Sequence, residues 1–295
     1  MLGALLSREL TLSLRRGGFH VLLTVQTLFA LVLAFGLERG VRLLTPAIPR
    51  SLGTTTTASL TGPAAIFASS VETTLLLAWG GWLVFACALA VPALAGASIA
   101  RERERGTLSV LLGAGARPAA LVAVKLGTVI LLTAGLLASG LPALGLALMF
   151  GSPRLESIAA AGLILLVWGC LIASLTLVCS ALANTASAGV AGALIASNLL
   201  LSLTVILPVG ATALGATLPG LAYRLNPLFA MLLTEPEVGR RLVEQLASGP
   251  WLDAFAADPG LPGPAWLPFV VLALALAAIL GGATSLVLSK RPTDG

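Results

Sequence analysis

Charge is scarce in this chain of 295 residues. Only 10% of the residues are Asp, Glu, Lys or Arg, whereas a soluble globular domain has about a quarter. Apolar residues make up 58% of the chain, and the mean hydropathy is +1.03. Several apolar runs reach the length of about 18 residues or more that a membrane crossing requires. The composition therefore excludes an ordinary soluble domain and predicts an integral membrane protein.

Residues that commonly carry catalysis or bind metals are few, with one histidine and three cysteines in the chain. His20 lies at the mouth of the first apolar run, so we interpret it as an interfacial side chain rather than a proton relay. Cys87, Cys170 and Cys179 fall within apolar runs, without a CxxC pattern or a Cys/His spacing. The chain has no G-x-x-x-x-G-K-[ST] motif. We therefore expect no catalytic residue, no metal site and no bound cofactor in this chain.

The apolar runs predict an all-α fold with six transmembrane helices in a single domain, residues 1–295. A transmembrane helix needs about 20 mainly apolar residues. Stretches of this kind lie at residues 19–37, 75–98, 121–150, 158–183, 188–207 and 266–288. The leucines and arginines of residues 1–18 predict an interfacial helix, and residues 38–74 an external loop. The weakly apolar start of residues 208–265 leaves open a re-entrant segment there.

The distribution of charge predicts the orientation of these spans. An even number of spans places both termini on one side of the membrane. With the termini inside, the inner segments hold ten basic and four acidic residues, and the outer segments hold seven basic and eight acidic residues. Basic residues gather on the cytoplasmic side of membrane proteins. We therefore expect both termini in the cytoplasm.

This bias also accounts for the net charge of +5 without a nucleic-acid partner. A nucleic-acid-binding surface would combine a basic stripe with aromatic residues, and no such stripe occurs. The aromatic residues instead predict a belt at the outer membrane interface. Its members would be Trp79, Trp82, Tyr223, Trp251 and Trp266.

The densest charge in the chain lies between the second and third spans, at residues 101–112. This block begins Arg-Glu-Arg-Glu-Arg-Gly-Thr-Leu. Arg101 and Arg105 lie one helical turn apart, and so do Glu104 and Leu108. The pattern predicts a short amphipathic helix along the inner membrane surface that docks on a partner protein.

The second half of this block is apolar. Leu108, Leu111 and Leu112 fall on one helix face. Gly106-Thr107 predicts a bend or a new helix start, because Gly is unfavourable inside a helix and Thr can cap one. A generic basic loop on the inner side, without a specific partner, is the alternative, and periodicity alone favours it.

A resemblance to a known family favours the docking interpretation instead. The segment after the second span of ABC-2 type permeases resembles the run Glu102-Arg103-Glu104-Arg105-Gly106-Thr107-Leu108, then Leu111-Leu112, Arg117-Pro118 and Lys125. In that family an acidic/basic pair precedes Gly-Thr-Leu, two leucines follow, and a lysine opens the third span. The six-span layout, the large loop after the first span, the extramembrane stretch after the fifth span and Asn226-Pro227 are also similar.

The resemblance implies a transmembrane subunit of an ABC exporter that pairs with a separate ATP-binding subunit, usually as two of each. The permeases would form a homodimer or a heterodimer, and ATP and Mg²⁺ would bind to the partner chain. The residues implied to couple to the ATPase are Arg101, Glu102, Arg103, Glu104, Arg105, Gly106, Thr107, Leu108, Leu111 and Leu112. Asn184 and Thr185, in the turn between the fourth and fifth spans, would form a second cytoplasmic contact. A simple connector is the alternative for that turn.

Other functions remain open. One is a maturation or secretion permease of the same build, such as a heme-exporter B-like protein. Another is a stand-alone secondary carrier, which the near absence of acidic residues from the span centres disfavours. A third is a membrane scaffold without its own transport. The sequence does not specify a transported substrate.

Small residues in the fifth predicted span, including Gly189, Gly192 and Ala196, predict close helix packing. The packing partner would be another helix of the same chain or a second permease.

Overall fold

The computed structural model describes residues 2–14, 17–44, 71–142, 155–206, 226–234, 264 and 266–290. The elements within these residues are all helical, and no strand occurs among them. The helices are α1 Leu2–Leu14, α2 Gly17–Leu44, α4 Val71–Ala95, α5 Ser98–Glu104, α6 Thr107–Gly113, α7 Pro118–Ala138, α9 Leu155–Leu182, α10 Ala186–Leu201, the π-helical η3 Ser202–Ile206, α13 Pro227–Leu232 and α16 Leu267–Lys290. The predicted all-α class is confirmed for this part of the chain.

Five helical stretches among the described residues are long and apolar enough to cross a membrane, as in a multi-pass membrane protein. They are Trp79–Glu104, Pro118–Ala138, Leu155–Leu182, Ala186–Thr204 and Leu267–Lys290. They correspond to the second to sixth predicted spans. α7 starts earlier than the third span that the sequence predicts. Pro118 occupies the first turn of this helix, where its missing N–H is tolerated.

The first predicted span, residues 19–37, lies within α2. This helix has 28 residues, which corresponds to about 42 Å at 1.5 Å per residue. Its apolar stretch among the described residues, Phe19–Val32, is shorter than the other five and than the roughly 20 residues that a span needs. The first predicted membrane crossing therefore stays a prediction.

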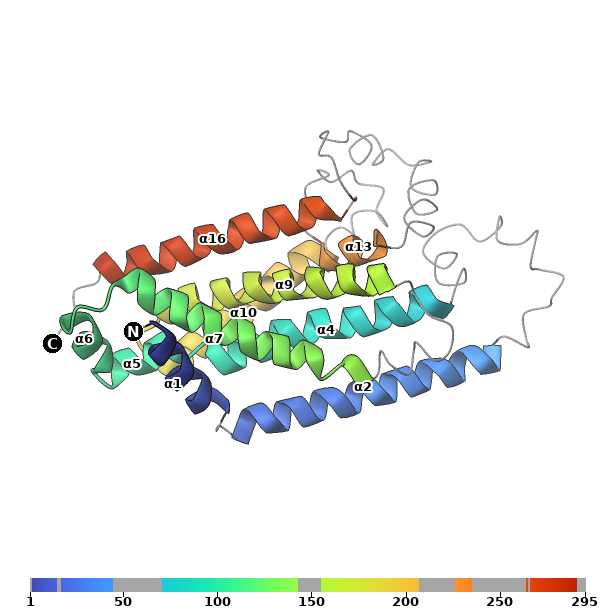
Figure 1. The fold of residues 1–295 in the computed structure, drawn as a ribbon, viewed down its shortest axis with the longest axis horizontal. Coiled ribbons are helices and arrows are strands. Elements are labelled where there is room, and N and C mark those ends of the chain that lie inside the picture. Colours follow the sequence, from blue (N-terminus) through green and yellow to red (C-terminus); the bar gives the residue numbers. More distant parts are fainter. Residues whose placement is uncertain are drawn as a thin grey trace.

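The centre of the bundle is α9, which packs against α16, α10, α4 and α7 (Figure 1). Its sequence is apolar around its whole circumference, which is typical of a helix surrounded by other helices or lipid. Trp168 is fully buried, and its indole N–H donates to the carbonyl oxygen of Val84 in α4 at 3.3 Å. The core thus ties α4 to α9 halfway along the bundle.

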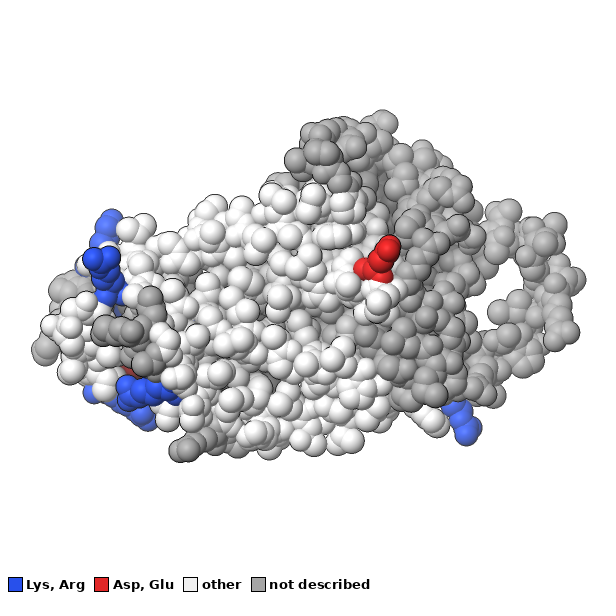
Figure 2. Space-filling model, in the orientation of Figure 1, with Lys and Arg blue, Asp and Glu red and all other residues white. Residues whose placement is uncertain are grey.

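Basic side chains gather at one end of the bundle, which we call the charged end (Figure 2). This end holds the start of α1, α5 and α6, the turn between α9 and α10, and the end of α16 (Figure 1). α2 leads from the charged end along α4 to the opposite end. The first and last described residues, Leu2 and Lys290, therefore lie at the same end of the bundle.

Two tryptophans of the predicted aromatic belt pack against other parts of the chain. Trp79 is buried and its indole N–H donates to the carbonyl oxygen of Gly140 at 3.2 Å. The indole N–H of Trp82 donates to Gln26 Oε1 of α2 at 2.9 Å. Buried indole N–H groups usually find a partner of this kind, so both tryptophans hold helices together.

Several predictions fall outside the described residues. These are most of the loop at residues 38–74, the end of the third span at residues 143–150, most of residues 208–265, and Tyr223 and Trp251. The question of a re-entrant segment in residues 208–265, which the sequence leaves open, also falls largely outside the described residues. Of residues 208–265, the structure describes the short helix α13, which begins at Pro227. Asn226 Oδ1 caps this helix by accepting from two N–H groups.

Candidate docking site at the charged end

The docking element, which we define as α5, α6 and the turn between them (residues 98–113), follows α4 directly. The residue before α5, Ala97, makes no side-chain cap. Ser180 of α9 supplies the cap instead, because its hydroxyl oxygen accepts from the N–H groups of Ile99 and Ala100 at 3.0 and 3.2 Å. Ser180 is fully buried, so the first turn of α5 is fixed to the core of the bundle.

The other end of α5 is fixed to the turn between α9 and α10. Arg103 Nη1 donates to the carbonyl oxygen of Ala183 at 2.6 Å. Glu104 Oε1 accepts from the N–H of Ala186, the first residue of α10, at 2.7 Å. The helix dipole favours a carboxylate at this position. Both charged side chains therefore have partners within the chain.

α5 and α6 are separated at Gly106. Its φ is +67°, a left-handed conformation that costs a residue with a Cβ about 1–2 kcal/mol. The predicted new helix start is confirmed, because α6 begins at Thr107. Thr107 does not cap that helix, since its hydroxyl donates to the carbonyl oxygen of Glu102 at 3.2 Å. The predicted one-turn spacing of Glu104 and Leu108 is wrong, because the break lies between them.

α6 has one buried face and one exposed face. Leu108 is buried, and Leu111 and Leu112 pack beside it against α7, α9 and α16. The predicted apolar face is therefore confirmed. Val110, on the other face, is 70% exposed, and the neighbouring Thr107 is also exposed. This exposed face is the part of the docking element that another molecule can reach.

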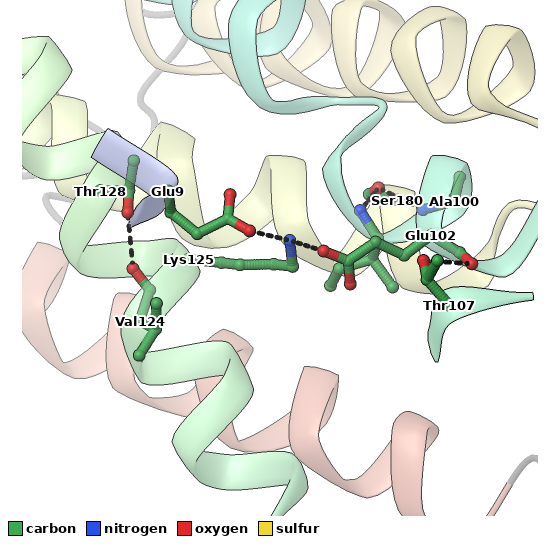
Figure 3. Close-up of polar contacts among 9 residues, drawn as sticks. Glu9, Ala100, Glu102, Thr107, Val124, Lys125, Thr128 and Ser180 are labelled. Carbon is green, nitrogen blue, oxygen red and sulfur yellow. Dashed lines mark hydrogen bonds and ion pairs between the residues drawn. The ribbon is translucent and has the colours of Figure 1, made fainter. Parts of the chain in front are cut away.

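An ion pair joins the docking element to α7 (Figure 3). The Lys125 ammonium lies 2.7 Å from Glu102 Oε1 and 3.9 Å from Glu9 Oε1 of α1. The Lys125 side chain is only 3% exposed, against 18% for Glu102 and 33% for Glu9. Removing the counter-ion of a buried charge costs about 3–5 kcal/mol. Three helices therefore meet at one ammonium group.

Several of the predicted coupling residues bond within the chain. Glu102, Arg103 and Glu104 all bond within the chain. Arg105 is exposed, as is Arg117 just before α7, and neither has an ion-pair partner among the described residues. The charged side chains that remain for another molecule at this site are thus basic rather than acidic.

The two predicted contact regions lie side by side. The turn with Asn184 and Thr185 is exposed, and the bond from Ala186 to Glu104 joins it to α5. Thr185 caps α10, because its hydroxyl oxygen accepts from the N–H of Ala188 at 3.2 Å. Arg101, one turn before Arg105, is half-buried. The two predicted contact regions are therefore neighbours at the charged end.

Two glycines permit a close helix crossing beside the docking element. Gly96, between α4 and α5, and Gly189 of α10 are both buried. A Cβ on Gly189 would overlap the carbonyl oxygen of Gly96, and a Cβ on Gly96 would lie 2.8 Å from the Cα of Val190. Backbone atoms cannot rotate away from such contacts. Of the two partners predicted for Gly189, the structure shows a helix of the same chain.

Sequence reasoning missed Ser180 and Glu9. Ser180 lies 81 positions from Ile99, so no local spacing reveals it as the cap of α5. A signal for the ion pairs was present, since Lys125 lies in an apolar run and such a lysine needs a counter-ion. That signal does not tell which carboxylate is close, because the choice depends on how α1 and α5 pack.

The described residues contain no group of three or more His, Cys, Asp or Glu side chains that could hold a metal ion. Cys87, Cys170 and Cys179 are free thiols. Scans against protein-family models and against curated proteins found no match for this chain. The functional interpretation therefore rests on the docking element and on the family resemblance of residues 100–125.

Proposed function

We propose that this chain is the membrane-spanning permease subunit of an ATP-driven ABC exporter and docks on a separate ATP-binding subunit through α6. The exposed face of α6 around Val110 carries the proposal. The resemblance of residues 100–125 to ABC-2 type permeases gives the identity of the partner. ATP and Mg²⁺ would bind to that partner, and two permease chains would pair in the inner membrane of a prokaryote with the charged end in the cytoplasm.

The contacts of the docking element support a role in transmitting movement. A displacement of α6 that carries α5 with it would pass from α5 to α9 through Ser180, to α10 through Glu104 and to α7 through Lys125. Packed helices shift as units because interiors are dense and nearly incompressible. A movement driven by ATP hydrolysis in the partner would therefore change the relative positions of several spans, as alternating access requires.

The same contacts refine the chemistry of docking. Because Glu102 and Glu104 are engaged within the chain, we expect Arg105, Val110 and Arg117 to face the ATPase. Exposed basic groups and an exposed valine at the same end of the bundle would fit a partner surface that combines acidic and apolar side chains. Glu104 then positions α5 and does not contact the partner.

Co-purification tests this proposal. The tagged chain is extracted from its native membrane in mild detergent as wild type, Val110→Asp and Leu155→Asp, and proteins that co-purify are identified and assayed for ATP hydrolysis. Leu155 is the matched control, because it is an apolar residue with 78% exposure at the opposite end of the bundle. We expect a P-loop ATPase to co-purify with the wild type and with Leu155→Asp. With Val110→Asp we expect at least a tenfold loss of the recovered ATPase, because a charge buried in the interface would cost about 1.4 kcal/mol or more of binding free energy.

The other outcomes have distinct meanings. An ATPase recovered equally with Val110→Asp would place docking elsewhere on the chain. No ATPase with an intact wild-type preparation would contradict the proposed function. Transport driven by an ion gradient would then point to a secondary carrier, and binding without any transport to a scaffold.

A further inference from the structure

A buried lysine that couples moving helices needs a counter-ion in every position of those helices. Lys125 lies seven residues into α7, and its side chain is 3% exposed. Leu121 and Val122, one turn before it on α7, are buried and apolar. An ammonium without a counter-ion in such a place is strongly destabilising. Any displacement of α5 that separates Glu102 from Lys125 would meet this cost unless a second carboxylate is at hand.

Glu9 provides that second carboxylate. Glu9 and Glu102 reach the Lys125 ammonium from opposite sides, one from α1 and the other from α5 (Figure 3). The distances are 3.9 Å to Glu9 Oε1 and 2.7 Å to Glu102 Oε1. A charge-assisted hydrogen bond needs about 2.8 Å, so the ammonium has to move by only about 1 Å toward Glu9. The four-carbon stem of lysine allows a movement of this size.

The carboxylate of Glu102, the present partner of Lys125, forms a hydrogen bond through only one of its two oxygens. Glu102 Oε1 accepts from Lys125, whereas Glu102 Oε2 is buried and has no hydrogen-bond partner. A carboxylate with both oxygens satisfied would be fixed in place, because fully satisfied buried networks are rigid. The Glu102 carboxylate lacks this second attachment, so the Lys125 pair is the main polar contact that it loses when α5 moves.

We propose that Lys125 exchanges between two carboxylates, with Glu102 as its partner in this conformation and Glu9 as its reserve partner when α5 is displaced. Glu9, Glu102 and Lys125 are positioning residues in this scheme. The exchange keeps the ammonium paired throughout and draws α1 toward α7 as α5 leaves. The presence of a reserve partner stands without the ATPase; its use during a transport cycle rests on the proposed function.

A double-mutant cycle on the purified full-length chain tests the reserve partner. The thermal unfolding midpoint is measured for Glu9→Gln, Glu102→Gln and the double variant. If either carboxylate can pair with Lys125, each single variant lowers the midpoint slightly, and the double variant lowers it by more than the sum of the two shifts. In a chain that carries Lys125→Met, the shift of the double variant should equal the sum of the single shifts, because no ammonium remains to pair with either carboxylate. Additive shifts in the Lys125 chain would overturn the proposal.

Glu104→Gln supplies the matched control for this cycle. Glu104 is also an α5 carboxylate, but its partner is the N–H of Ala186. Its combination with Glu9→Gln is therefore expected to be additive. An excess of equal size in this control would mean that the coupling comes from α5 in general, which would also overturn the exchange at Lys125.

A distance measurement covers the case in which the double variant does not fold. Spin labels are placed on the exposed Leu12 of α1 and Ala123 of α7, in a chain whose three cysteines are replaced by alanine. We expect the distance distribution to narrow in Glu102→Gln, where Lys125 turns to Glu9, and to broaden in Glu9→Gln. An unchanged distribution in Glu102→Gln would contradict the exchange. Neither measurement involves the ATPase, so its result is separate from that of the docking test.

Discussion

At the scale of single residues, helix geometry decides which partner each charged side chain of the docking element bonds. Glu102 and Glu104 have the same chemistry and lie two positions apart, yet Glu102 pairs with Lys125 of α7 and Glu104 with the first N–H of α10. Two positions on an α-helix are about 200° apart, so these side chains leave α5 on opposite sides. These two acids therefore tie α5 to two different helices of the bundle.

The cap of α5 gives a prediction at this scale. Ser180→Ala removes the acceptor from the N–H groups of Ile99 and Ala100, and such a loss costs about 0.5–2 kcal/mol in free energy of unfolding. We expect amide hydrogen exchange at Ile99 and Ala100 to speed up accordingly. Ser174→Ala is the control, since Ser174 is also fully buried in α9 but its hydroxyl donates only to the carbonyl oxygen of Cys170 in its own helix. Equal exchange rates in the two variants would refute the role of Ser180 as a cap.

At the scale of elements, the position of the docking element depends on how closely α10 approaches the end of α4. Gly96 and Gly189 meet there through their backbones. Small residues permit such crossings in membranes, where van der Waals contact drives helix association. The crossing places the start of α10 beside α5, so that Glu104 can reach Ala186.

Replacing Gly189 by Ala is expected to destabilise the chain. Alanine gains up to about 1 kcal/mol over glycine inside a helix, but overpacking a tight contact costs about 1–3 kcal/mol, and the Cβ would overlap the carbonyl oxygen of Gly96. The cost of the close contact outweighs the gain in helix propensity, because the opposing atom belongs to the backbone and cannot move away. Thermal unfolding in detergent measures the effect.

Gly192→Ala, one turn further along α10, is the control for that measurement. Its Cβ would lie 3.9 Å from Cys179 Cβ, an ordinary contact. We expect this variant to be as stable as the wild type or slightly more stable, because only the propensity gain applies. A Gly189→Ala chain with the same unfolding midpoint as Gly192→Ala would show that the crossing is looser than the structure indicates.

At the scale of the whole molecule, the described charges avoid the middle of the bundle. Lys125 lies deepest, and it is paired. The charged end carries the docking element, whereas Glu156 lies near the opposite end, at the start of α9. Because basic residues gather on the cytoplasmic side of membrane proteins, this distribution supports the proposed orientation, with the charged end toward the cytoplasm.

Labelling with a membrane-impermeant maleimide checks this orientation. In a chain with Cys87, Cys170 and Cys179 replaced by alanine, single cysteines are introduced at Val110 and at Leu155, both of which are exposed. We expect Leu155→Cys to react in intact cells and Val110→Cys to react only after the membrane is permeabilised. Reaction of both cysteines in intact cells, or the reverse pattern, would contradict the predicted orientation.

Local sequence information was sufficient for several features. Apolar runs identified the positions of α4, α7, α9, α10 and α16, because the bilayer requires a continuous apolar helix of a set length. Gly106 marked the break between α5 and α6, because glycine is unfavourable inside a helix and readily adopts a left-handed backbone conformation. The apolar face of Leu108, Leu111 and Leu112 followed from helical spacing alone. Each of these features depends on neighbours within about one turn or on the lipid.

Tertiary structure alone decided the partners of the charged residues. Glu102 is 23 positions from Lys125, and Glu104 is 82 positions from Ala186. Sequence reasoning assigned these carboxylates to a partner protein, but the packing of α5 against α7, α9 and α10 engages them within the chain. The physical reason is that an ion pair or a helix cap requires atoms within about 3 Å. A sequence fixes such distances along one helix, while between helices only their packing does so.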